Sequence, residues 1–135
     1  MQNFLYALIQ TLHNLGAATV VGATAAALWL VRGELAAQRR LAILLSIAWA
    51  IQAMSGALFG ITTYTFGKQL PDIHGVAIVA LIIKAACAIA GFILAAITAK
   101  WQADWPSSRR LLSWYASLLL GVTALSSAAF LRWFS

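Results

Sequence analysis

The chain has 135 residues, of which 63% are hydrophobic and 9% are charged, and its net charge is +6. A soluble domain of this length needs a polar surface, and about a quarter of its residues are normally charged. The composition therefore excludes an ordinary soluble domain and favours a chain that lies in a lipid bilayer. The basic residues stand singly or in pairs at the ends of apolar runs. This pattern indicates membrane anchoring and does not favour nucleic-acid binding.

Four apolar runs, each longer than the roughly 20 residues that cross a bilayer, predict four transmembrane helices. They cover about residues 4–31, 41–65, 74–99 and 111–131. The connections between them are short, so consecutive helices are expected to be antiparallel. We predict one all-α domain over residues 1–135, an integral membrane four-helix bundle.

The basic residues also predict an orientation. Six of them fall in the first and third connections, namely Arg32, Arg39, Arg40, Lys100, Arg109 and Arg110. The opposite side carries only Lys68 and Arg132. By the positive-inside rule the richer side faces the cytoplasm, which places both termini outside. The size and this charge bias favour a multi-pass protein of a bacterial inner (cytoplasmic) membrane.

Small residues in the helices predict close helix packing. Gly56 and Gly60 form a GxxxG pair in the second helix, and glycine and alanine recur in the first and third helices. In lipid such faces let backbones approach closely and drive association. They indicate packing within the bundle, with room for a flat cofactor as the less common alternative.

Two absences narrow the function. All three carboxylates, Glu34, Asp72 and Asp104, fall in the predicted connections. A proton-coupled exporter needs a titrating carboxylate within the membrane, so the pattern argues against a small multidrug transporter. The single cysteine, Cys87, excludes an intrachain disulfide and a metal site built from cysteines.

The two histidines are candidates for haem ligation. His13 lies near the outer end of the first helix, and His74 opens the third helix on the same side. Two histidines from two helices can supply both axial ligands of a b-type haem. Lys68 and Arg132, on this side, could pair with the haem propionates. Counted from the predicted cytoplasmic boundaries, the two histidines differ in height by about 10 Å, which a tilt or a longer third helix would have to absorb. The alternative to haem ligation is that His74 belongs to the helix cap and that His13 hydrogen-bonds a neighbouring helix.

Lys84 stands near the middle of the third helix, on a face shared with small residues. We expect it to point into the bundle, where a backbone carbonyl, Gln52, a cofactor carboxylate or another subunit could pair with it. Its role is then either functional or purely structural.

Met54, Cys87 and the histidines offer a different hypothesis, a copper site with soft ligands.

These residues carry a family resemblance. The segment Leu12-His13-Asn14-Leu15-Gly16 resembles the histidine-bearing first helix of the copper-resistance-protein-D-like membrane family. Trp49-x-x-Gln52-x-x-Ser55-Gly56 and Lys84 in the third helix are similar to the same family, over helices one to three. Related four-helix proteins include b-type cytochromes, a haem-biosynthesis oxidase and proteins linked to copper uptake. The resemblance points to His13 and Lys84 as functional positions, while Thr19-Val20-Val21-Gly22 departs from the family's Trp-x-Gly-Gly run.

From this reasoning we expect a small haem b protein that passes electrons, with His13 and His74 as axial ligands and Lys84 as a further cofactor-binding residue. Its partners would be a quinone or a periplasmic redox protein such as cytochrome c. We expect it to act as one subunit of a larger complex or as a homo-oligomer, and not as an enzyme on its own. The alternatives are a non-catalytic accessory subunit and a copper transporter.

Overall fold

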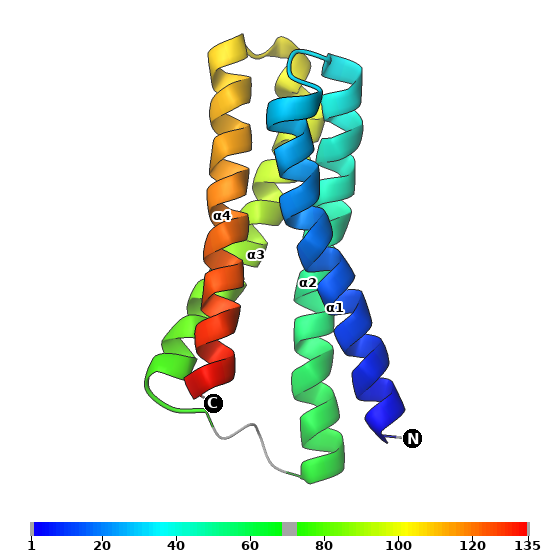
Figure 1. The fold of residues 1–135 in the computed structure, drawn as a ribbon, viewed down its shortest axis with the longest axis vertical. Coiled ribbons are helices and arrows are strands. Elements are labelled where there is room, and N and C mark those ends of the chain that lie inside the picture. Colours follow the sequence, from blue (N-terminus) through cyan, green and yellow to red (C-terminus); the bar gives the residue numbers. More distant parts are fainter. Residues whose placement is uncertain (1, 69–72, 135) are drawn as a thin grey trace.

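The computed structural model describes residues 2–68 and 73–134, and it consists of four long helices in an up-and-down bundle (Figure 1). α1 spans Gln2–Ala25 and continues as a π-helix over Ala26–Leu30; α2 spans Leu35–Gly67. α3 spans Val76–Trp101 and continues as a 3-10 turn over Gln102–Asp104, and α4 spans Ser107–Phe134. Each helix packs against its neighbour in the chain, and α4 also contacts α1. The predicted all-α four-helix bundle is confirmed.

All four helices in the described part of the chain are long and apolar enough to cross a membrane. Many large apolar side chains on them point outward, among them Ile82 and Leu119. Outward apolar side chains are unfavourable in water but suit a hydrocarbon solvent, in which the helix satisfies its own backbone hydrogen bonds. The chain is therefore a multi-pass membrane protein.

The largest differences from the predicted helix boundaries are at the starts of α2 and α4. α2 begins at Leu35 instead of residue 41, and α4 begins at Ser107 instead of residue 111. The prediction began both helices after the arginines that precede their apolar runs. Arginine, alanine and glutamine are good helix formers, so each helix extends toward the N-terminus beyond its apolar run. α3 begins at Val76, since Gly75 has a φ of 52°, outside the helical region. Asp72, a candidate cap for the third helix, lies outside the described residues.

The core lies in the half of the bundle nearer the two connections that join α1 to α2 and α3 to α4. Its largest buried side chains are Trp49 of α2 and Trp114 of α4, with Leu45. Gly91 of α3 lies directly against the Trp49 indole, so that even a β-carbon at this position would overlap the ring. This close approach holds α3 against α2 at a defined height.

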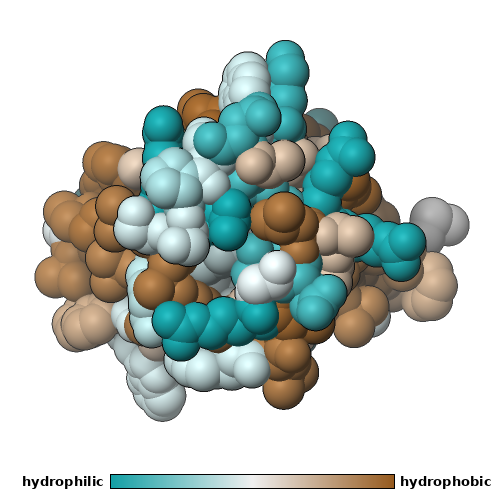
Figure 2. Space-filling view, turned by 90° about the horizontal axis from the view of Figure 1, so that it is seen from above, coloured by the Kyte–Doolittle hydropathy of each residue, from teal (hydrophilic) through white to brown (hydrophobic). Residues whose placement is uncertain are grey.

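The connection end of the bundle is polar. α1 begins and α4 ends at one end, and the α1–α2 and α3–α4 connections lie at the other (Figure 1). Figure 2, which views the connection end along the bundle, shows hydrophilic residues gathered on the end face with hydrophobic residues around it. This is the polarity expected where a bundle leaves the hydrocarbon layer.

Candidate functional site

His13 lies in the middle of α1 and faces α2 and α3. Its side chain is only 9% exposed. Its Nδ1 lies 2.7 Å from the Oγ of Ser55 on α2, and its Nε2 lies 2.9 Å from the Nζ of Lys84 on α3. Three helices thus contribute one side chain each to a polar cluster inside an otherwise apolar bundle. We call His13, Ser55 and Lys84 the polar triad.

The hydrogen bonds of the polar triad form a consistent sequence. A lysine ammonium only donates, so Lys84 donates to Nε2 of His13. Nε2 then carries the lone pair and Nδ1 carries the proton, which His13 donates to Ser55 Oγ. The Ser55 hydroxyl in turn donates to the Ile51 carbonyl at 2.6 Å. The surroundings therefore select one tautomer of the imidazole, with its lone pair directed at Lys84.

Further contacts fix the height of His13. Gln52 of α2 donates from its amide nitrogen to the His13 carbonyl. Gly16, one turn along α1, leaves the space that this amide occupies, because a β-carbon there would lie 2.6 Å from the Gln52 nitrogen. The ring of Phe59 packs edge-on against the imidazole, with centroids 6.0 Å apart. The side chain of His13 is therefore positioned by packing as well as by hydrogen bonds.

The electrostatics of the polar triad are unbalanced. Lys84 is half-buried, and helices α1 to α4 contain no Asp or Glu. A cation inside a membrane bundle is costly and normally pairs with an anion or with carbonyl groups. Lys84 instead faces a neutral imidazole. Such a centre favours the approach of an anionic group or of a ligand oxygen.

The other predicted site residues lie at the end of the bundle where α1 begins. His74 stands exposed two residues before α3, and Lys84 is eight residues, or about 12 Å along the axis, beyond the first residue of α3. Lys68 is the exposed C-cap residue of α2, and Arg132 lies exposed in the last turn of α4. The structure thus brings His13 and Lys84 together and leaves the other three residues at the end of the bundle.

The proposed copper ligands do not converge. Met54 is 66% exposed on the outer face of α2, whereas Cys87 is buried on α3. Among the described residues, no group of three His, Cys, Asp or Glu side chains is arranged to hold a metal ion. The structure offers no assembled set of soft ligands from these residues.

The hydrogen bond between His13 Nδ1 and Ser55 Oγ is of a kind that metal-bound histidines also make. A metal-bound histidine generally donates its second ring N–H to a nearby acceptor, which orients the ring and increases its basicity. The bond from Nδ1 to Ser55 is of this kind, so Nε2 would be the atom to ligate a metal. Lys84, whose Nζ lies 2.9 Å from Nε2, would have to move away from it. The bis-histidine arrangement with His74 stays a prediction.

The sequence reasoning predicted that Lys84 faces inward, and this is confirmed. It missed His13 as the partner of Lys84, although a signal was present. His13 lies 19 residues before Arg32 and Lys84 lies 16 residues before Lys100, so the two side chains have similar heights from the connection end. It named Ser55 in a family motif but did not assign it to the site, although Ser55 follows Gln52 by three residues and therefore shares its helix face.

No family model, curated protein or solved structure matches this chain. The similarity to the copper-resistance-protein-D-like family therefore stays a prediction that rests on the short motifs around His13, Gln52 and Lys84.

Proposed function

We propose that this chain is a small membrane protein that passes electrons through a b-type haem held by His13. The observation that carries the proposal is the hydrogen bond from His13 Nδ1 to Ser55 Oγ at 2.7 Å. It supports the proposal because metal-bound histidines bond a nearby acceptor in the same way, and the ligating atom would then be Nε2, which Lys84 would have to vacate. A haem bound there would supply one-electron chemistry at its iron, with a potential set by its ligands and surroundings.

Lys84 supports the same proposal through its charge. No acidic side chain lies on the four helices to neutralise it. A haem propionate is a carboxylate that could reach such a cation and form a charge-assisted hydrogen bond. In this proposal His13 holds the iron and Lys84 balances a propionate charge.

The proposed setting is a bacterial inner membrane, with both termini on the outer side, as the distribution of basic residues favours. The loops are too short to form a catalytic domain, so electrons would pass to a quinone or to a periplasmic redox protein. The chain would act as a subunit of a larger complex or as a homo-oligomer.

An accessory subunit without a cofactor is the second candidate, and Gly56 and Gly60 favour it. A β-carbon at either glycine would meet nothing within 4 Å. The GxxxG face of α2 is therefore not used within the chain, and in lipid such a face can pack against another helix. In that case the polar triad would only hold α1, α2 and α3 together.

A visible absorption spectrum of the detergent-purified protein, before and after dithionite, tests the proposal. We expect a sharp reduced α-band in the b-type region and stoichiometric haem, both lost in His13→Ala. Asn14→Ala is the matched control, because Asn14 follows His13 on α1 but hydrogen-bonds Gln10 on the exposed face. Absence of haem from the protein and its complex, or an unchanged band in His13→Ala, would overturn the proposal.

Two further variants separate the alternatives. Loss of the band in His74→Ala as well would establish the bis-histidine arrangement, and its retention would assign only His13. An unaltered spectrum in His13→Ala, combined with loss of a copurifying subunit in Gly56→Leu, would establish the accessory role.

A further inference from the structure

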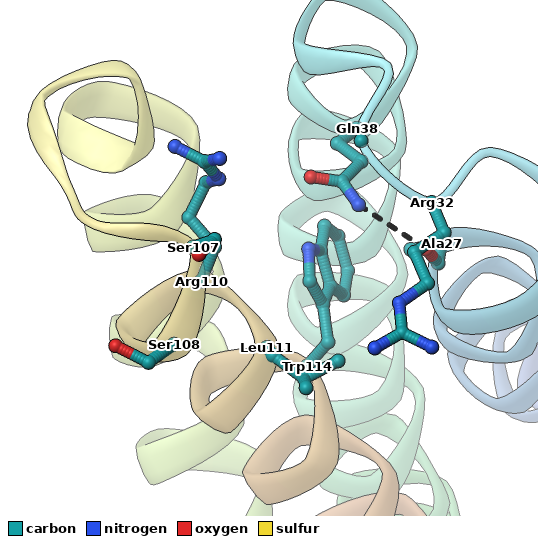
Figure 3. Close-up of a pocket in the computed structure, with 9 residues that line it drawn as sticks. Ala27, Arg32, Gln38, Ser107, Ser108, Arg110, Leu111 and Trp114 are labelled. Atoms are coloured by element: carbon teal, nitrogen blue, oxygen red, sulfur yellow. Dashed lines mark hydrogen bonds between the residues drawn. The ribbon is translucent and has the colours of Figure 1, made fainter.

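A cavity of about 280 Å³ opens at the connection end of the bundle (Figure 3). Ala27 in its lining follows His13 of the polar triad by 14 residues along the same continuous helix. It lies between the π-helix that ends α1, the first turns of α2 and the first turns of α4. Its polar lining comes from Arg32, Gln38, Ser107, Ser108, Arg110 and Trp114. At about 30 Å³ for each water molecule, the space could hold roughly nine waters. It is therefore large enough for a tetrahedral anion and part of a headgroup.

The lining is rich in hydrogen-bond donors and positive charge. Arg32 and Arg110 contribute two guanidinium groups, and only one bond of Arg110 is to the protein backbone, from Nη1 to the Trp105 carbonyl at 2.6 Å. Ser107 and Ser108 begin α4, a helix of 28 residues. Their backbone N–H groups have no intrahelical acceptor, and the helix dipole adds partial positive charge at this point. Together these groups have the chemistry of a phosphate site.

Two buried polar atoms point independently to a missing ligand. Trp114 is only 1% exposed and Gln38 only 5% exposed, yet the indole Nε1 and the amide Oε1 have no hydrogen-bond partner. The Gln38 amide cannot simply be reversed, because its Nε2 donates to the Ala27 carbonyl at 3.2 Å. Figure 3 shows both unpaired atoms on the side of the cavity toward Ser107 and Arg110. Buried polar atoms of this kind are normally paired, so a donor and an acceptor are left for a bound group.

We propose that this cavity binds a phosphoryl group that also carries a hydroxyl. Arg110, on the side of the cavity to which the unpaired atoms of Trp114 and Gln38 are turned, neutralises its charge, and Trp114 Nε1 and the first turn of α4 donate to its oxygens. Arg32, on the other side of Trp114, adds positive charge to the cavity (Figure 3). Gln38 Oε1 accepts from the hydroxyl. Both the headgroup of an anionic phospholipid and free hydrogen phosphate have this chemistry. Neither Glu34 nor Asp104, the carboxylates in the described connections, lines the cavity.

The position of the cavity is consistent with either source of phosphate. It lies on the polar end face that Figure 2 shows, where the bundle passes from apolar to charged surface. Arg32, Ser107 and Ser108 are exposed there, so the site is accessible from the headgroup layer and from solution.

Binding measurements with two probes test the proposal. The full chain in detergent is titrated with inorganic phosphate, and the chain in phosphatidylcholine vesicles with and without phosphatidylglycerol is assayed for retained lipid by native mass spectrometry. In the double variant Arg32→Gln/Arg110→Gln we expect the affinity for phosphate and for phosphatidylglycerol to fall by about tenfold or more for each arginine replaced. The control is Arg40→Gln/Lys100→Gln, which removes the same charge from the same end without touching the cavity lining.

Trp114→Phe gives an independent readout, since it keeps an aromatic ring and removes the indole donor, together with part of the side-chain volume. We expect it to weaken binding several-fold while the helical content stays unchanged. Binding of both probes supports a general phosphoryl site, and retention of phosphatidylglycerol alone assigns the site to a lipid headgroup. Equal weakening in the cavity and control pairs, or binding of neither probe, would overturn the proposal in favour of diffuse surface electrostatics.

Discussion

Replacing Ser55 with alanine should destabilise the bundle, because the hydroxyl is the acceptor for His13 across the α1–α2 interface. Ser55 is 3% exposed, and its Oγ lies 2.7 Å from Nδ1 of His13. In Ser55→Ala, Nδ1–H loses its partner. If the proton moves to Nε2, it meets the N–H groups of Lys84. Either tautomer leaves one donor unpaired in a buried site.

The size of the effect follows from the position of this bond. Interhelical hydrogen bonds in membrane proteins contribute about 0.6 kcal/mol on average and about 1.7 kcal/mol at most. The His13–Ser55 bond is short and buried, and it has Lys84 on its other side. We therefore expect a loss of about 1–1.7 kcal/mol, or roughly five- to twentyfold in the folding equilibrium.

Unfolding by SDS in mixed micelles, followed by circular dichroism, measures this loss. Ser46→Ala is the matched control, because Ser46 lies on the same helix and bonds only the Ala42 carbonyl of its own helix. We expect it to change the unfolding free energy by less than about 0.5 kcal/mol. A double-mutant cycle with His13→Ala isolates the pair. Equal losses in the two serine variants, or a coupling energy of zero in the cycle, would refute the reasoning.

Three further substitutions test the packing and charge of the same region. Gly91→Ala should lower the unfolding free energy by about 1–3 kcal/mol, because the added β-carbon overlaps the Trp49 indole. The control Gly56→Ala should have little effect, because nothing lies within 4 Å of the added β-carbon. Equal SDS midpoints for the two variants would contradict this prediction. Gly16→Ala should displace the Gln52 amide from the His13 carbonyl and cost about 1 kcal/mol, and the same cost in a Gln52→Ala background would disprove that cause. Lys84→Met should leave the thermal midpoint unchanged or raised, because it removes a cation that no helix carboxylate balances; a midpoint lower by more than about 5 °C would show that the bond to His13 is a main structural contact.

The sequence alone determined that the chain forms four membrane-spanning helices. Each apolar run is long enough to cross the bilayer, and a helix satisfies its backbone hydrogen bonds within the run itself. The inward direction of Lys84 was also predictable, since it shares a helix face with small residues and with Cys87. Both conclusions depend on local spacing along one helix.

Only the tertiary structure decided which side chains meet. The bond between His13 and Lys84 depends on the relative height and rotation of α1 and α3, which non-local contacts such as Gly91 against Trp49 set. The sequence places His13 and Lys84 at similar heights in the bundle, but height alone does not show that they touch. A rotation of either helix about its axis would separate the two side chains. The cavity likewise needs the ends of α1, α2 and α4 together, with Gln38 and Trp114 facing one space. Helix formation is local in the chain, but the packing that builds both sites joins residues far apart in the sequence.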